Sequence, residues 1–146
     1  MSYNSILVLN GEPNSVFLEI FFKFLKKRKI KSPLILISSL KIVKLQMRKL
    51  KFNKRIRVLD YKKIENYKLN NNSINIINVD FTQKKAFERI SNKSNDYISK
   101  CFEIAFKIIK QKKISKLITG PISKKNFLNR RYLGITEYLS KKFNIR

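Results

Sequence analysis

The sequence has no histidine and a single cysteine, and these two absences remove several kinds of site at once. Without histidine, the commonest general base and the commonest ligand of transition metals are missing. With Cys101 alone, neither an internal disulfide nor a cysteine-based zinc cluster can form, and no imidazole is present to activate its thiol. We therefore expect Cys101 to be a small hydrophobic side chain of the core.

Long hydrophobic runs are missing as well. No stretch approaches the roughly 20 apolar residues that span a bilayer. The short run at Ile6–Leu9 has no basic segment before it and no cleavage site after it, so a signal peptide is not expected. These absences predict a cytoplasmic protein with no membrane partner.

Acidic residues are few: nine stand against 34 lysines and arginines, which gives a formal net charge of +25. A balance this basic is common in proteins that bind nucleic acids. Two observations weaken that interpretation. The basic residues are spread over the whole chain, and the abundance of Lys, Asn and Ile is typical of a gene rich in A and T. We do not expect a nucleic-acid partner.

At 146 residues, with 43% hydrophobic residues, the chain is expected to form one domain with a sizeable core. Its apolar patterns alternate between strands and helices, which predicts an α/β fold with a mostly parallel sheet and helices on both faces. The helix at 15–28 is apolar around much of its circumference, so it is expected to pack on more than one side. Ser15 is its expected N-cap. The predicted strands are 6–9, 34–37, 55–59, 73–79 and 116–119. The further predicted helices are 39–50, 95–111 and the segment from 136 onward. Residues 60–72 are expected to form a polar, irregular surface excursion that can include one helical turn.

Only three glycines occur, and each lies between a predicted strand or loop and a predicted helix: Gly11, Gly120 and Gly134. Glycine is favoured where the backbone needs a positive φ or where a ligand approaches closely. A short helix is predicted after Gly120-Pro121, with Lys124 in its first turn, and such a helix start could hold a phosphate or carboxylate. A plain Gly-Pro turn with solvated lysines is the alternative, and Thr136 likewise fits either an N-cap or a hydroxyl offered to a ligand.

Three motifs in this order resemble the N-terminal part of the 4-hydroxythreonine-4-phosphate dehydrogenase family of vitamin B6 biosynthesis. Gly11-Glu12-Pro13 matches the family's Gly-Glu-Pro turn, although Asn14-Ser15-Val16-Phe17 departs from the Gly-Ile-Gly-Pro that follows it there. Residues 118–124 match Ile-Thr-Gly-Pro-Ile-Asn/His-Lys. Residues 134–138, Gly-Ile-Thr-Glu-Tyr, match Gly-His-Thr-Glu-Phe/Tyr.

The resemblance implies a truncated isocitrate dehydrogenase-like fold and, in the full-length family member, a homodimer. The activity it implies is NAD-dependent oxidation and decarboxylation of a phosphorylated hydroxy amino acid on a divalent metal. Thr136 and Lys124 would bind substrate, and Ile135 stands where the family has a histidine. The metal ligands and most of the NAD site lie in the C-terminal remainder, so this chain is expected to supply no catalytic or metal-binding residue. The turn residues expected at the site are Gly11, Glu12, Gly120, Pro121 and Gly134.

Three interpretations follow. The favoured one is that residues 1–146 are the N-terminal portion of such a dehydrogenase and have little activity alone. The expected truncation is based on the last helix, which has no Gly cap and is followed by no strand that would cover it. The second is a small basic nucleic-acid-binding domain with aromatic rings that stack on bases; against it, Phe17, Phe21, Phe24 and Phe102 fall on predicted core faces. The third is a non-catalytic paralogue that keeps half of the fold as an interaction partner.

Overall fold

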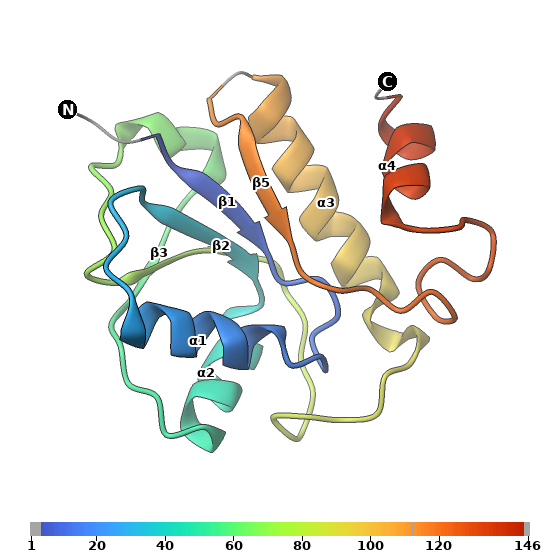
Figure 1. Cartoon of the computed structure of the whole chain (residues 1–146), viewed down its shortest axis with the longest axis horizontal. Helices are drawn as coiled ribbons and strands as arrows, with labels where there is room; N and C mark the ends of the chain where they lie inside the picture. Colours follow the sequence, from blue (N-terminus) through green and yellow to red (C-terminus); the bar gives the residue numbers. More distant parts are fainter. Residues whose placement is uncertain (1–3, 112, 145–146) are drawn as a thin grey trace.

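A computed structural model describes residues 4–111 and 113–144 of the chain. Its centre is a sheet of five parallel strands in the order β3-β4-β2-β1-β5 (Figure 1). The strands are β1 (Ile6–Leu9), β2 (Leu34–Ser38), β3 (Ile56–Val58), β4 (Ile74–Asn78) and β5 (Lys116–Thr119); the α-helices are α1 (Phe17–Lys27), α2 (Leu40–Lys49), α3 (Asn95–Lys110) and α4 (Ile135–Phe143), and the 3-10 helices are η1 (Tyr61–Asn66) and η2 (Asn92–Ser94).

The central strands are buried on both faces. Along β1, Leu7 and Leu9 belong to the core under α3, whereas Val8 belongs to the core under α1 and α2. Alternate residues of a strand point to opposite faces, so a strand covered on both sides must be apolar throughout. This is why the predicted continuous apolar runs are strands, and the predicted α/β fold with helices on both faces is confirmed.

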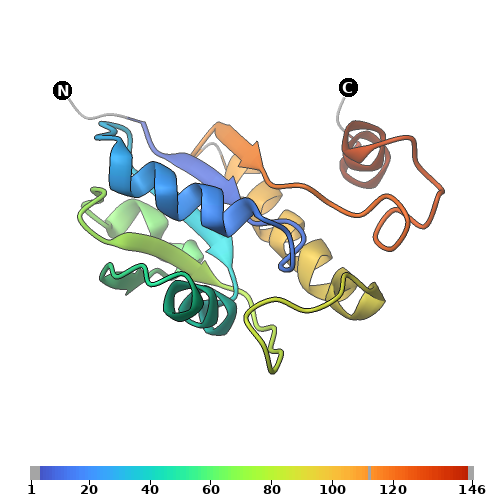
Figure 2. The ribbon, with the colours of Figure 1, turned by 60° about the horizontal axis from the view of Figure 1, so that its bottom comes forward.

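The helices form two unequal layers. Figure 2 shows α1 and α2 together on one face of the sheet, with α3 on the other and α4 beyond α3. An aromatic cluster joins α4 to α3: the rings of Phe102 and Tyr138 lie 5.9 Å apart, and those of Phe106 and Phe143 stack at 4.2 Å. Cys101 is fully buried in the same core, as expected, and burial raises the pKa of its thiol to about 12.

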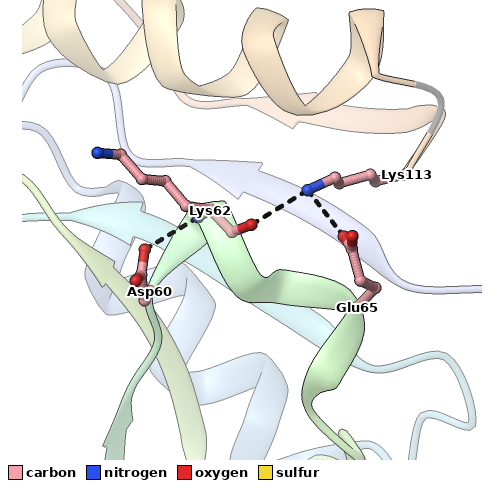
Figure 3. Close-up of polar contacts among 4 residues, drawn as sticks. All are labelled: Asp60, Lys62, Glu65 and Lys113. Carbon is pink, nitrogen blue, oxygen red and sulfur yellow. Dashed lines mark hydrogen bonds and ion pairs between the residues drawn. The ribbon is translucent and has the colours of Figure 1, made fainter.

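The amino ends of the strands lie beside a polar junction between η1 and the segment before β5. Lys113 Nζ forms an ion pair with Glu65 Oε2 at 2.7 Å and donates to the carbonyl of Lys62 at 3.3 Å (Figure 3). The hydrogen bond from Lys113 lowers the pKa of Glu65. A cleft of about 800 Å³ opens here, at the end of the sheet away from the strand-to-helix loops.

Most predicted elements are confirmed within two residues, but the segment after β5 is not helical. Residues 121–123 have no regular structure and 124–134 form turns and bends, in which Asn129 and Arg130 have positive φ angles of 48° and 57°. Two adjacent left-handed residues cannot continue a right-handed helix. The predicted short helix is therefore wrong, and with it the placing of Lys124 in a helix first turn.

Two expectations for α1 are also wrong. Its N-cap is Val16, although the Ser15 hydroxyl does accept a hydrogen bond from the Phe17 N–H at 3.2 Å. The helix is packed on one side only, because Val16, Ile20 and Phe24 are exposed. Phe21 and Phe102 do lie in the core, as predicted, but Phe24 does not.

At the other end of the chain, Asn144 in the left-handed conformation takes the place of a glycine C-cap after α4. No helix in the described part of the chain is long and apolar enough to cross a membrane.

Candidate functional site

The carboxyl end of the sheet contains a point where neighbouring strands lead to opposite faces. β1 runs into α1 on one face, whereas β5 leads through 121–134 to α4 on the α3 side (Figure 1). Ligands of open α/β sheets bind beside such a switch point. The turns after β1 and β5 are therefore the first place to look for a site.

These two turns hold each other through their backbones. The Gly120 N–H donates to the Leu9 carbonyl at 2.7 Å, and the Glu12 N–H donates to the Pro121 carbonyl at 2.8 Å. A Cβ on Gly120 would lie 2.0 Å from the Asn10 oxygen, and one on Gly11, where φ is +73°, would lie 2.4 Å from the Pro121 oxygen. Both glycines are thus required by contact between the two turns, which accounts for them without any ligand.

Glu12 fastens this pair of turns to the start of α3. Its side chain is buried, with 2% of its surface exposed. Oε1 accepts from the Asn14 N–H and Oε2 from the Ser94 hydroxyl, both at 3.1 Å. Burial raises the pKa of Glu12, and the hydrogen bonds from Asn14 and Ser94 oppose that rise in part. The Glu12 carboxylate therefore satisfies the backbone N–H of Asn14 within its own turn.

A second buried network lies at the ends of β1 and β2. Asn10 donates through Nδ2 to Ser38 Oγ at 3.1 Å, and Ser38 Oγ lies 3.1 Å from the Tyr97 hydroxyl. That hydroxyl also accepts from the Ser39 N–H at 3.2 Å. Burial raises the pKa of Tyr97, so it stays neutral. Asn10 Oδ1 is buried without a hydrogen-bond partner among the described residues.

Side-chain amides join the loop between β4 and η2 to the turn after β1 by hydrogen bonds. Asn14 and Gln83 exchange hydrogen bonds of 3.1 and 2.7 Å, and Gln46 of α2 donates to the carbonyls of Pro13 and Ala86. A cleft of about 310 Å³ adjoins this loop. Its lining includes one acidic residue and three basic ones: Glu88, Lys84, Arg89 and Lys93.

Sequence reasoning missed both the buried network and this cleft. The available signal was a polar residue directly after each apolar run, at Asn10 after β1 and at Ser38 in β2. Because the strands of a parallel sheet run in the same direction, residues at their carboxyl ends lie near one another. Tyr97 and Gln46 gave no such signal, because each occurs at a helix position that a hydrophobic residue could equally fill.

Lys124 lies in the exposed part of the segment after β5. Its backbone carbonyl accepts from the Arg130 N–H at 3.3 Å, and the nearby Ser123 carbonyl accepts from Phe127 and Leu128 at 2.9 and 3.2 Å. The Ser123 hydroxyl also accepts from the Asn126 N–H at 3.0 Å, so this segment forms one capped turn and not a helix. Lys124 can therefore offer a ligand only the positive charge at the end of its long, exposed side chain.

The third motif begins α4. Gly134 is its N-cap, with an extended φ of −171° and no atom within 4 Å of where a Cβ would be. Thr136 is therefore inside the helix, so the N-cap alternative for it is wrong, and its side chain is exposed. Ile135 packs against the core under α3. Glu137 accepts from the Leu133 N–H at 2.6 Å and pairs with Lys141, and both lower its pKa.

The structure thus brings only some of the predicted site residues together. Gly11, Glu12, Gly120 and Pro121 are in direct contact, whereas no hydrogen bond or ion pair in the described chain joins Lys124 or Thr136 to them. No group of three or more His, Cys, Asp or Glu side chains in residues 4–111 and 113–144 could hold a metal ion. These residues therefore do not fit the divalent metal that the resemblance implies.

The model of the pyridoxal phosphate biosynthetic protein PdxA family matches residues 29–146. This range includes the motifs at 118–124 and 134–138 and leaves out Gly11-Glu12-Pro13. No curated protein matches the chain.

Solved structures share the fold. A 4-hydroxythreonine-4-phosphate dehydrogenase from Burkholderia phymatum superposes with a TM-score of 0.84 at 18% identity, over 99% of this chain and 44% of its own. The corresponding Klebsiella pneumoniae protein gives 0.83 at 17%, over 98% and 45%. A Salmonella typhimurium protein described as the same dehydrogenase gives 0.81 at 21%, over 98% and 45%. The chain therefore spans less than half the length of these solved relatives.

Proposed function

Because the chain belongs to the pyridoxal phosphate biosynthetic protein PdxA family, we propose that it is the N-terminal part of a dehydrogenase of vitamin B6 biosynthesis. The proposed reaction is the NAD-dependent oxidation, with decarboxylation, of 4-phosphooxy-threonine. The observation that carries this proposal is the family match, which runs through both the Gly-Pro motif at 118–124 and the Gly-Ile-Thr-Glu motif at 134–138. We further propose that the full-length form is a cytoplasmic homodimer.

In this proposal, residues 4–144 supply a scaffold and substrate contacts, and the chemistry is supplied by the part of the protein outside the match. A divalent metal would polarise the substrate hydroxyl and the ketone that forms from it, and NAD would accept the hydride. The described residues offer no metal cluster, so no step through the metal can be assigned to them. The chain alone is therefore expected to bind substrate weakly and not to turn it over.

Two exposed side chains are proposed to contact substrate. Lys124 carries a positive charge on an exposed turn, which suits a phosphate group. Thr136 presents a hydroxyl on the exposed side of the first turn of α4. Ile135 occupies the family's histidine position but packs against the core and cannot form a hydrogen bond. We propose that this replacement alters which hydroxy acid the site prefers.

Binding of 4-phosphooxy-L-threonine, measured by isothermal titration calorimetry, tests the proposed contacts. Lys124→Ala should weaken binding about tenfold or more, because a charge-assisted hydrogen bond of about 1.5–3 kcal/mol is lost. Lys125→Ala, an exposed lysine of the same turn, is the matched control and should leave the affinity unchanged. Equal losses in the two variants would show that general positive charge, and not Lys124, attracts the ligand.

A non-catalytic paralogue is the second candidate, and the isoleucine at position 135 favours it. The coding DNA after the codon for Arg146 should be read first, and the complete gene product then assayed for NADH formation at 340 nm with a divalent metal added. Metal-dependent turnover supports the dehydrogenase. Substrate binding without turnover supports the paralogue, and the absence of both would remove the proposed function.

A further inference from the structure

A second cleft opens at the amino ends of the strands, next to the cleft beside Lys113 and on its β3 side. It has a volume of about 430 Å³ and is lined by the end of α1 and by the segments that come before β2, β3 and β4. Figure 1 shows the end of α1 and the start of β2 away from the turns after β1 and β5. Small-molecule sites have volumes of about 300–1,000 Å³. The cleft is thus large enough for a small ligand and is separate from the candidate site.

The charge of this cleft is of one sign. Its lining includes four basic side chains and no acidic one: Arg28, Lys29, Lys31 and Lys54. In residues 4–111 and 113–144, no carboxylate forms an ion pair with Arg28, Lys29 or Lys54. Lys54 is also half-buried, which limits the access of water to its side chain. Like charges gathered in a cleft repel one another and attract an anion.

The dipole of α1 accounts for only part of this charge. Cations are favoured at the C-terminal end of a helix. Lys26 and Lys27 lie in the last turn of α1, and Arg28 is its C-cap. Lys54, however, comes from the segment before β3, and Lys31 from the segment before β2. Basic residues from separate segments of the chain therefore meet at one cleft.

Hydrogen bonds hold the walls of the cleft in place. Asn71 donates through Nδ2 to the carbonyls of Ile30 and Ser32, at 3.1 and 2.8 Å. Its Oδ1 accepts from the Leu34 N–H at 2.8 Å. The loop before β4 is thus bound to the loop before β2, which carries Lys31. The cleft is formed before any ligand binds, so a ligand need not order it.

The charges and the lining favour a compact phosphorylated ligand. A phosphate group carries about 1.5–2 negative charges near neutral pH, so four cations match two phosphate groups or more. Single-stranded nucleic acids are bound largely by stacking of bases on aromatic rings, and none of the described residues that line this cleft is aromatic. In the neighbouring cleft, Lys113 is already paired with Glu65 (Figure 3). The unpaired positive charge is therefore local and does not continue as a long track.

We propose that the cleft between the end of α1 and the loop before β4, called the α1–β4 cleft, binds a small ligand that carries two or more phosphate groups. Arg28, Lys29 and Lys54 contact the phosphates. The α1–β4 cleft lies at the opposite end of the sheet from Gly120. The inference therefore does not rest on the proposed dehydrogenase reaction.

Binding of inorganic triphosphate to the 146-residue chain, measured by isothermal titration calorimetry, tests the proposal. The titration is done at about 0.15 M salt, where distant surface charges are screened. One triphosphate should bind per chain, and Lys54→Met should weaken binding about tenfold, because it removes a charge-assisted contact and keeps most of the stem. Lys107→Met, which removes an exposed charge on α3 across the sheet, is the matched control and should leave the affinity unchanged.

Two results of this titration would overturn the proposal. The first is the absence of triphosphate binding at millimolar concentration. The second is an equal loss of affinity in Lys54→Met and Lys107→Met, because the anion would then be attracted by the general positive charge of the chain. Lys29→Met changes an exposed residue of the same cleft and replaces Lys54→Met if that variant does not fold.

Thermal unfolding separates a ligand contact from a structural role of Lys54. Without triphosphate, Lys54→Met should have at least the Tm of the wild type, because repulsion within the cleft is reduced. Saturating triphosphate should raise the Tm of the wild type, since it binds the folded state, and should raise that of Lys54→Met less. A lower Tm of Lys54→Met without ligand, with an undiminished rise on adding triphosphate, would overturn the assignment of Lys54.

Competition experiments identify the source of the phosphates and keep the two proposed sites apart. Single-stranded DNA of about ten nucleotides should bind more weakly than triphosphate. If it binds more tightly and also loses affinity on Lys68→Met in the neighbouring cleft, the occupant is a nucleic acid and the proposal is wrong. Lys124→Ala should leave triphosphate binding unchanged, and Lys54→Met should leave 4-phosphooxy-threonine binding unchanged. Failure of one site would therefore not be mistaken for failure of the other.

Discussion

The turn at Gly120 and the turn at Gly134 differ in what surrounds them. Gly120 lies against the turn after β1, and a methyl group there would lie 2.0 Å from the Asn10 oxygen. Gly134 starts α4 with an extended backbone, and a methyl group there would meet nothing within 4 Å. One glycine is required by the fold as it stands, and the other is not.

This difference separates two kinds of motif residue. Gly11 and Gly120 allow the two turns to lie in contact. Glu12 holds the turn after β1 against the start of α3 by accepting hydrogen bonds from Asn14 and Ser94. At Gly134 the surroundings are open, and the neighbouring Thr136 is exposed. The open turn leaves room for a ligand or another segment of protein, whereas the closed turn does not. Variants at the two turns can break or sharpen this comparison.

The largest effect is expected from Gly120→Ala. Overpacking usually costs about 1–3 kcal/mol, and more where the obstacle is backbone that cannot rotate away, as the Asn10 oxygen is. We expect the free energy of unfolding to fall by about 3 kcal/mol or more, measured by urea denaturation. Gly120→Ala with wild-type stability would show that the two turns can move apart freely, and the distinction from Gly134 would be lost.

Removing the Glu12 carboxylate should have the next largest effect. Glu12→Ala leaves the Ser94 hydroxyl and the Asn14 N–H without their acceptor in a buried site, at a cost of about 1–3 kcal/mol. Ser91→Ala removes a nearby hydroxyl that accepts an exposed hydrogen bond from the Lys93 backbone N–H at 3.3 Å; it serves as the control and should cost well under 1 kcal/mol. If the two variants lose similar amounts of unfolding free energy, the buried hydrogen bonds of Glu12 stabilise the fold no more than an exposed one does.

Glu12→Gln gives the same site a pH dependence of known sign. Because burial raises the pKa of Glu12 above 4.5, the folded state holds this proton more tightly than the unfolded state. The resulting stability is complete below pH 4.5 and is lost as the pH rises through the folded-state pKa. The wild type and Glu12→Gln should therefore have similar free energies of unfolding at acid pH. Toward neutral pH, the free energy of unfolding of Glu12→Gln should rise relative to that of the wild type. A difference that does not change with pH would contradict the raised pKa.

The fold could be predicted from the sequence largely because its signals are local. The apolar runs at β1, β2 and β4 and the helical spacing in α3 each reflect burial on a particular face. The segment after β5 misled because Lys124 to Leu128 has helix-compatible composition, whereas its conformation is decided at Asn129 and Arg130. Asn129 gives only a weak signal in the sequence, because asparagine is enriched at positive φ, and Arg130 gives none.

The candidate site was less predictable than the fold, because its contacts join distant parts of the chain. Gly11 and Gly120 were recognised as special positions, but the sequence suggested a ligand where the structure has the opposite turn. Ser38 and Tyr97 are 59 residues apart and meet only because β2 and the start of α3 converge at one edge of the sheet. Sequence order alone gives no such pairing.

A smaller effect, of opposite sign, is expected at α4. The Tyr138 ring packs against Phe102, Phe127 and Tyr132, but its buried hydroxyl has no hydrogen-bond partner among the described residues. Tyr138→Phe keeps the packing and removes an unpaired polar group, so it should raise the free energy of unfolding by up to about 1 kcal/mol. Tyr132→Phe is the comparison, since that side chain is only partly buried. A destabilised Tyr138→Phe would show that the hydroxyl does find a partner, such as water.

The smallest effects are expected at Gly134 itself. Its extended backbone is the conformation of an ordinary N-cap, and serine and glycine differ there by only a few tenths of a kcal/mol in favour of serine. Gly134→Ser should therefore raise the free energy of unfolding slightly, and Gly134→Ala should lower it by no more than about 1 kcal/mol. If either variant instead weakens 4-phosphooxy-threonine binding tenfold at unchanged stability, the open space at this turn is occupied by substrate. Glycine at 134 would then be required by the ligand, as Gly120 is required by the fold.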